Sequence, residues 1–318
     1  MRRQHKALAL LAVVPLSAAA CGGDDDDDAA TSGGDNGGEA QTEVPDGPDI
    51  KIGAQDFGES AILASIYDQA LDGAGFTSDV AEVGGFRDLL FAAFESGDVN
   101  LAPEYVASEA NFLEAGSASA DLDASMEALQ PLLEAKGLVA LDPSEAVDKN
   151  VFVMTSERAD ELGIETLSDL AEKGADLKLG APQDCEENAF CIPGLKDVYG
   201  LDLTSNFVPL DAGVVGTSLN EGAIDVATLF STDGRLADED WVVLEDDKGL
   251  AGADNIVPVL SQELVDAYGD QLTGVLNDIS AQLTTDNMIA MNKAYDIDHE
   301  DAEDIAADWL SDHDISTG

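Results

Sequence analysis

The sequence predicts an α/β protein made of two similar lobes with a central ligand cleft between them. From Asp49 onward, short apolar runs alternate with stretches of helical periodicity, which is typical of α/β folds. The same strand and helix unit then occurs twice in the 318 residues, at offsets of 125 to 127. Ligands of such folds bind at the carboxyl ends of the strands, and we expect those ends to face each other across the cleft.

The first unit is predicted to alternate strands with helices. Period-two and period-3.6 patterns place the elements in this order: strand 50–52, helix 61–71, strand 76–83, helix 87–94 ended by Gly97, and strand 99–102 stopped by Pro103.

Three segments of this unit recur in the same order in the second unit. They are Asp49–Ala54 with Asp176–Ala181, Thr77-Ser78 with Thr204-Ser205, and Gly97–Ala102 with Gly222–Ala227. The strand that is repeated last runs on to Tyr105 in the first unit and to Phe230 in the second. Both rings therefore follow equivalent strands, beside the polar residues Ser108 and Asp233, and we expect them in the cleft; the alternative is that both fill the core.

The chain must cross between the lobes twice. The apolar run 151–154 is the expected first crossing, and the run 256–260 is the return, in which Pro258 favours an edge or crossing strand. Lobe one is accordingly expected at 49–152 and 258–318, and lobe two at 153–257. Later helices, one of them capped by Thr285, are expected to pack on lobe one.

The N-terminus has the pattern of a secretory signal over residues 1–20, with basic residues, a short apolar run and small residues before Cys21. The small residues before Cys21 resemble a bacterial lipoprotein box, which implies a lipid anchor on the outer face of the cytoplasmic membrane; the alternative is a plain secreted chain. Residues 21–48 contain five consecutive Asp and little that is apolar, so they are expected to form a disordered acidic linker.

The formal net charge of −52 would repel phosphate backbones and excludes nucleic acid as a partner. We interpret this charge as a surface that stays hydrated in high salt, with a weak indication of a cationic ligand.

Cys185 and Cys191 remain as a pair in an oxidising compartment and predict a disulfide. Two free thiols or half of a metal site are the alternatives.

The residues that catalysis would need are scarce. Beyond the signal the only histidines are His299 and His313, and there is no phosphate loop, dinucleotide fingerprint or cysteine/histidine metal cluster. Carboxylates are abundant, but no spacing singles out a pair. We therefore expect a protein that is not an enzyme and has no cofactor.

Several segments resemble the substrate-binding proteins of ABC-type osmoprotectant importers. These segments are 52–60, Pro103–Ser108, 193–200 and 230–235, and the similarity covers about residues 50–312. Pro103-Glu104-Tyr105 is its most specific part. The resemblance implies a two-lobed, periplasmic-binding-protein-like (type II) fold. It also implies a quaternary ammonium ligand such as glycine betaine or choline, and a membrane permease as partner.

The resemblance implies an aromatic cage for the ligand. Tyr105 and Phe230 match cage positions of the family, and Phe152 matches a third position less closely. Phe57 and Phe190 are nearby loop aromatics, whereas Phe91 and Phe94, at helical spacing, are expected in the core. Rings hold trimethylammonium groups by cation–π attraction.

For a ligand carboxylate, Ser108, Arg87 and Arg235 are the candidate donors, although each Arg is also a candidate for a surface ion pair. Many relatives carry Arg where this chain has Asn188. This difference leaves open whether the ligand is a betaine, choline or another solute.

The expected mechanism is a hinged trap that closes on its ligand, in a protein expected to be monomeric. Rival hypotheses keep the fold with another solute (an amino acid, a polyamine or a sulfonate) or replace it by a secreted hydrolase or a cell-surface interaction module.

Overall fold

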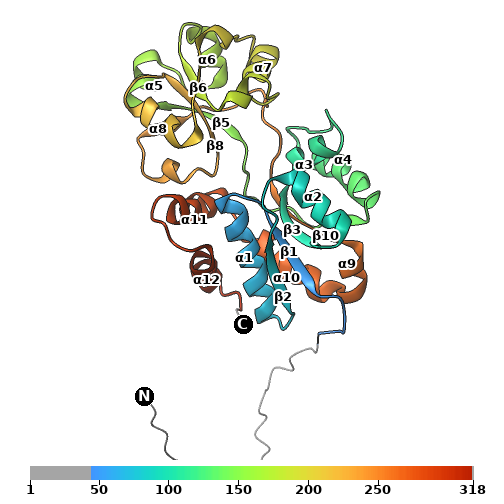
Figure 1. Cartoon of the computed structure of the whole chain (residues 1–318). Helices are drawn as coiled ribbons and strands as arrows, with labels where there is room; N and C mark the ends of the chain where they lie inside the picture. Colours follow the sequence, from blue (N-terminus) through green and yellow to red (C-terminus); the bar gives the residue numbers. More distant parts are fainter. Residues whose placement is uncertain (1–43, 317–318) are drawn as a thin grey trace, which may run out of the picture. The chain divides into compact units, whose positions relative to one another are not determined.

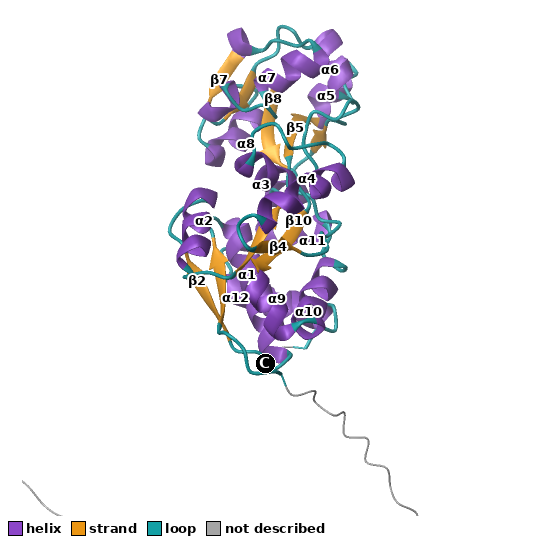
Figure 2. Cartoon of the chain, turned by 90° about the vertical axis from the view of Figure 1, so that its right-hand side faces the viewer, coloured by secondary structure: helices purple, strands orange, loops and turns teal. Residues whose placement is uncertain are grey.

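The computed structural model describes residues 44–316. Their strands form two five-stranded sheets, each in its own lobe, and helices cover both sheets (Figure 1 and Figure 2). The expected two-lobed α/β fold is confirmed. The expected signal and Cys21 lie outside the described residues, as does most of the expected linker. None of the described helices is long and apolar enough to cross a membrane.

The sheet of lobe one has the strand order β2-β1-β3-β10-β4. β1 pairs in parallel with β2 and β3, whereas β10 lies antiparallel between β3 and β4. The strands are β1 (Ile50–Ala54), β2 (Ser78–Glu82), β3 (Leu101–Tyr105), β4 (Leu138–Ala140) and β10 (Ile256–Ser261). The helices of this lobe are α1 (Gly58–Gly73), α2 (Arg87–Ser96), α3 (Val106–Leu113), α4 (Leu122–Glu134), α9 (Gln262–Tyr268), α10 (Asp270–Ser280), α11 (Thr285–Asp296) and α12 (Ala302–Asp312).

The sheet of lobe two has the corresponding order β7-β6-β8-β5-β9. β6 is parallel to β7 and β8, and β5 is antiparallel to β8 and β9. The strands are β5 (Asn150–Thr155), β6 (Leu179–Ala181), β7 (Phe207–Pro209), β8 (Val226–Phe230) and β9 (Trp241–Val243). Around them lie α5 (Ser156–Leu162), α6 (Leu167–Lys173), α7 (Ile192–Gly194) and α8 (Ala212–Asn220), with the short helices η1 (Gln183–Glu186), η2 (Leu195–Tyr199), η3 (Thr204–Asn206) and η4 (Gly234–Ala237).

The repeated glycines make equivalent packing contacts in both lobes. A Cβ on Gly53 would collide with Leu90 and Val99, and a Cβ on Gly180 would collide with Ile224, the residue equivalent to Val99. Each glycine lets a branched side chain pack across its strand. The prediction of an internal duplication therefore has a packing reason.

A second repeated position ties adjacent strands together. Asn100 Oδ1 accepts the N–H of Lys51 at 2.7 Å, and its equivalent Asp225 accepts the N–H of Lys178 at 3.0 Å. The polar residue at each position satisfies a backbone donor at the start of β1 or directly before β6.

The chain crosses between the lobes directly before β5 and β10. Val147 and Asn255 pair in an isolated antiparallel bridge, and the Asp148 N–H donates to Asp254 O at 2.9 Å. The apolar runs that were expected to cross are strands inside the two sheets. The chain therefore passes from one lobe to the other a few residues before the expected boundaries at 152 and 257. Apolar side chains are buried in sheets, and the polar residues ahead of them form the crossing.

Two prolines lie differently from the prediction. β3 continues through Pro103, and β10 is an interior strand in which Pro258 lies opposite Pro103. In an antiparallel pair, facing residues alternate between hydrogen-bonded and non-hydrogen-bonded positions, and two residues without N–H groups fit the latter. The expected strand end at Pro103 and the expected edge or crossing position of Pro258 were wrong for this reason.

The C-terminal helices pack on lobe one as expected. α12 lies against α1, and residues such as Leu276, Met288 and Trp309 join the core beneath β1 and β10. Thr284, one residue before the expected cap, closes a capping box with Asn287 at the start of α11. α11 also contacts η4 of lobe two, so it reaches both lobes.

Candidate ligand-binding cleft

A cavity of about 850 Å³ is lined by residues of both lobes and of the crossing segments. Tyr105 at the end of β3 and Phe230 at the end of β8 both line it, together with Ala181 at the end of β6 and Gln55 directly after β1. The carboxyl ends of the parallel strands meet at this cavity in both lobes, where ligands of open α/β sheets bind.

Aromatic rings line the lobe-one side of the cavity. The ring of Phe57 lies 6.4 Å from that of Tyr105 and 6.5 Å from that of Phe86. Tyr105 is 6% exposed, whereas Phe86 is 63% exposed, so the row runs from the core to the surface. In lobe two, Phe230 is 58% exposed. Such faces attract cations without needing hydrogen bonds.

Phe152 does not belong to this set. It is 1% exposed, packs in the core of lobe two and does not line the cavity. Its neighbours Val151 and Val153 join a second core cluster on the opposite face of β5, because side chains alternate across a strand. With both faces of β5 covered, the looser assignment of Phe152 to the cage is not supported. Phe91 is buried and Phe94 is half-buried in the lobe-one core, as expected.

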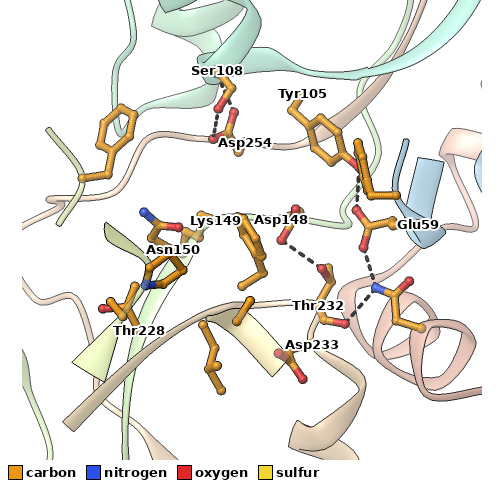
Figure 3. A pocket seen from close by; sticks show the side chains of 18 of the residues that line it. Glu59, Tyr105, Ser108, Asp148, Lys149, Asn150, Thr228, Thr232, Asp233 and Asp254 are labelled. Atoms are coloured by element: carbon orange, nitrogen blue, oxygen red, sulfur yellow. Dashed lines mark hydrogen bonds between the residues drawn. The ribbon is translucent and has the colours of Figure 1, made fainter. Parts of the chain in front are cut away.

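Hydrogen bonds connect Tyr105 to the other lobe. Tyr105 Oη donates to Glu59 Oε1 at 2.7 Å, and Asn292 Nδ2 donates to Glu59 Oε2 at 2.6 Å and to Thr232 O at 2.9 Å. Thr232 Oγ1 in turn donates to Asp148 Oδ1 at 2.9 Å. Figure 3 shows this series of hydrogen bonds from Tyr105 to Asp148. It spans α1, β3 and α11 of lobe one, the end of β8 and the crossing segment.

Burial raises the pKa of Glu59, although its hydrogen bonds from Tyr105 and Asn292 lower it. Burial and the nearby Glu59 carboxylate likewise raise the pKa of Asp148 well above its ordinary value. The pKa of Tyr105 is also raised, by burial first and then by Glu59, so its hydroxyl remains a donor. The floor of the cavity therefore holds carboxyl groups that are costly to ionise without a cation nearby.

Arg87 lines the cavity but is held by a carboxylate beneath it. Its Nε and Nη2 donate to Glu104 Oε2 at 3.0 and 2.8 Å, and the Glu104 side chain is fully buried. The expected ion pair is therefore present, and it is buried instead of lying at the surface. If Arg87 turned to a ligand, the buried carboxylate of Glu104 would lose its counter-ion.

Arg235 has a similar partner. Its Nε donates to Asp233 Oδ1 at 2.9 Å, and its Nη2 donates to Asp233 Oδ2 at 2.5 Å. Ser108 donates from its N–H and Oγ to Asp254, at 2.6 and 2.7 Å. Asn188 Oδ1 accepts the N–H of Phe190 at 2.8 Å. All four predicted polar residues line the cavity, and each has a partner within the protein.

The predicted disulfide joins Cys185 and Cys191. Both cysteines line the cavity, as do Asn188 and Phe190 inside the loop that they close. The Phe190 ring reaches Gly252, where an added Cβ would lie 3.6 Å from it. The bridge therefore fixes one wall of the cavity.

Sequence reasoning did not find Glu59, Phe86, Asp148, Lys149, Thr232, Asp254 and Asn292, which all line the cavity. Glu59 follows β1, Phe86 follows β2, and Thr232 follows β8, so the strand-end rule could have included them. Asn292 lies on a helix 233 residues from its partner Glu59, and no local pattern reveals such a pair. Within residues 44–316, no group of three or more His, Cys, Asp or Glu side chains is placed to hold a metal ion.

Six acidic residues and three basic residues line the cavity. The acidic ones are Glu59, Asp148, Asp184, Asp233, Asp254 and Asp296; the basic ones are Arg87, Lys149 and Arg235. The surplus of carboxylates, combined with exposed ring faces, suits a small cation that cannot donate hydrogen bonds.

Comparison with known proteins agrees with this geometry. Residues 48–312 match the OpuAC family, described as the substrate binding domain of ABC-type glycine betaine transport systems. The chain is 32% identical to a glycine-betaine-binding protein of Pseudomonas aeruginosa, over 83% of this chain and 88% of the relative. It is 24% identical to the glycine betaine-binding protein YehZ of Escherichia coli, over 82% of this chain and 89% of the relative.

A crystal structure described as a glycine betaine/carnitine/choline ABC transporter superposes with a TM-score of 0.76 at 25% identity, covering 84% of this chain and 99% of that one. The resemblance inferred from the sequence is confirmed. The chain belongs to the family of substrate-binding domains of ABC-type glycine betaine transport systems.

Proposed function

We propose that this protein is an extracytoplasmic lipoprotein that binds a quaternary ammonium osmoprotectant in the cleft and delivers it to the permease of an ABC importer. Its family is one of solute-binding proteins and not of enzymes. The relatives named above bind glycine betaine according to their names, and this supports glycine betaine as the first solute to test.

The observation that carries the proposal is the row of rings Phe86, Phe57 and Tyr105 in a cavity that Phe230 also lines and whose walls carry more carboxylates than cations. A trimethylammonium group has no N–H to donate, so ring faces and diffuse negative charge are what can hold it. Each ring face contributes about 0.5 to 2 kcal/mol, and desolvated contacts lie at the upper end.

Closure follows from the way in which the lobes are joined. Within residues 44–316 two backbone segments cross, and they pair with each other through Val147 and Asn255. Rotation about such a pair of strands brings the strand ends of the two lobes together. The solute favours the closed state by the difference between its affinities for the two states.

The test is calorimetry on the purified protein with glycine betaine, choline, carnitine and proline, with putrescine, taurine and glutamate as competitors of other classes. Saturable binding of one or more quaternary ammonium solutes, with compaction in small-angle scattering, is the expected result. Binding of proline, putrescine, taurine or glutamate, with none of the quaternary ammonium solutes bound, would assign the fold to another solute. Hydrolysis of model esters without binding would remove the proposal.

The lipid anchor has a separate test. Cells expressing the full chain are fed radiolabelled palmitate, and the label is expected in the wild-type protein and absent from Cys21→Ala. A wild-type chain that stays unlabelled and appears in the medium would show a plain secreted protein.

A further inference from the structure

We propose that Lys149 recognises the carboxylate of a zwitterionic quaternary ammonium solute and thereby sets the preference of the cleft between glycine betaine and choline. This inference rests on the proposed function. It concerns how the site distinguishes two solutes that share the same cationic head.

Arg87, Lys149 and Arg235 are the cationic residues that line the cavity. Arg87 is held by the buried carboxylate of Glu104, and Arg235 by Asp233. Withdrawing either arginine would leave its carboxylate without a counter-ion, and such losses are costly when the group is buried. Among the residues that the structure describes, Lys149 forms no ion pair. It is therefore the cation in the wall whose charge the protein does not already neutralise.

The backbone fixes Lys149 next to the aromatic wall of lobe two. Its N–H donates to Ser231 Oγ at 3.0 Å, and its carbonyl accepts the N–H of Ser231 at 2.8 Å. The following residue, Asn150, pairs with Phe230 across β5 and β8. Figure 3 shows Asn150, Lys149 and Asp148 in a row along the cavity. Lys149 thus lies directly before the strand residue that pairs with Phe230, and both Lys149 and Phe230 line the cavity.

This spacing matches the chemistry of a betaine. One methylene group separates the trimethylammonium head of glycine betaine from its carboxylate, so a head on the Phe230 ring places the carboxylate within reach of a neighbouring side chain. An ammonium group on a four-carbon stem adapts to such a position and donates charge-assisted hydrogen bonds. Acidic residues outnumber basic ones in the same cavity, and those that are ionised and unpaired would repel a carboxylate that has no counter-ion. Choline carries a hydroxyl there and needs no such compensation.

The experiment compares the two solutes by calorimetry in the full-length protein. Lys149→Met keeps most of the stem and removes the charge, Lys149→Arg keeps a charge, and Lys178→Met is the control because Lys178 is exposed and lies outside the cavity. Lys149→Met is expected to weaken glycine betaine binding at least about tenfold and to leave choline binding unchanged or stronger. Lys149→Arg should retain a preference close to that of the wild type, and Lys178→Met should change neither affinity.

Choline binding also reports whether each variant is folded. Equal weakening of both solutes by Lys149→Met, or no weakening of glycine betaine, would overturn this proposal and leave the proposed function standing. Binding of no quaternary ammonium solute, carnitine included, by the wild-type protein would overturn both.

Discussion

The hydroxyl of Tyr105 donates a hydrogen bond of 2.7 Å to Oε1 of Glu59, so the ring that lines the cleft is anchored to a buried carboxyl group. The ring and the hydroxyl therefore have separate roles. The ring face is available to a cation, and the hydroxyl fixes the angle at which the ring is presented.

Replacement of Tyr105 separates these roles. Tyr105→Ala removes the ring and is expected to weaken binding of the quaternary solute at least tenfold, which corresponds to about 1.4 kcal/mol. Tyr105→Phe keeps the ring and should cost less than Tyr105→Ala. Calorimetry with the best solute of the panel measures both, and unchanged affinity in Tyr105→Ala would remove Tyr105 from the site.

Glu109 is expected to make stability depend on pH. It is fully buried without a hydrogen-bond partner among the described residues, and burial, followed by the charge of Glu104, raises its pKa well above 4.5. The folded protein therefore binds a proton that the unfolded chain releases above about pH 4.5. Stability falls as pH rises from that value through the pKa of the folded state.

Glu109→Gln removes this ionisation and should flatten the decline. Thermal unfolding between pH 4.5 and 8 measures it, and the variant is expected to gain most over the wild type at pH 8. Glu114→Gln, at an exposed position just after the same helix, is the control. A gain that is the same at both ends of the pH range would contradict the assignment.

The glycine of the repeat has a measurable role. Gly53→Ala would place a Cβ 2.5 Å from Leu90 and 2.9 Å from Val99, and such overpacking costs about 1 to 3 kcal/mol. Val99→Ala added to Gly53→Ala should recover part of the loss. Gly274→Ala in α10, where a Cβ meets nothing within 4 Å, should be neutral or stabilising. Urea denaturation gives the unfolding free energies of these variants and of Val99→Ala alone, and additive losses in the double variant would argue against the contact.

The disulfide is expected to support both stability and affinity. Its loop spans a sequence separation of 6, for which the chain-entropy estimate is about 2 kcal/mol. Because Phe190 and Asn188 lie in this loop and line the cavity, Cys185→Ser with Cys191→Ser should also weaken solute binding. Denaturation and calorimetry on the oxidised wild type and on the double variant measure the two effects. Loss of stability with full affinity would limit the bridge to a structural role.

The acidic surface should make stability rise with salt. A formal net charge of −52 produces self-repulsion in the folded state that salt screens over about 10 Å at 0.1 M. The unfolding temperature is expected to rise between 0.1 and about 2 M KCl, whereas sucrose of equal osmolality should raise it less. Equal effects of the two solutes would point to general exclusion from the surface instead of charge screening.

The duplication, the strand ends and the disulfide could be predicted from the sequence because each depends on residues close together in the chain or on a repeated pattern. The same local packing occurs in both lobes, between Gly53 and Val99 and between Gly180 and Ile224. The internal repeat therefore makes these positions recognisable in the sequence. The positions of Tyr105 and Phe230 in the cavity followed from their place after equivalent strands.

The partners of the polar residues and the depth of each ring were decided by tertiary structure alone. Phe152 is buried because helices cover both faces of its strand, and Arg87 is occupied because Glu104 lies beneath it. Glu59 meets Asn292 only after α1 and α11 pack together. Hydrophobic periodicity specifies which face of an element is buried, but hydrogen bonds and ion pairs depend on atomic distances between elements far apart in the chain, and those distances exist only in the folded molecule.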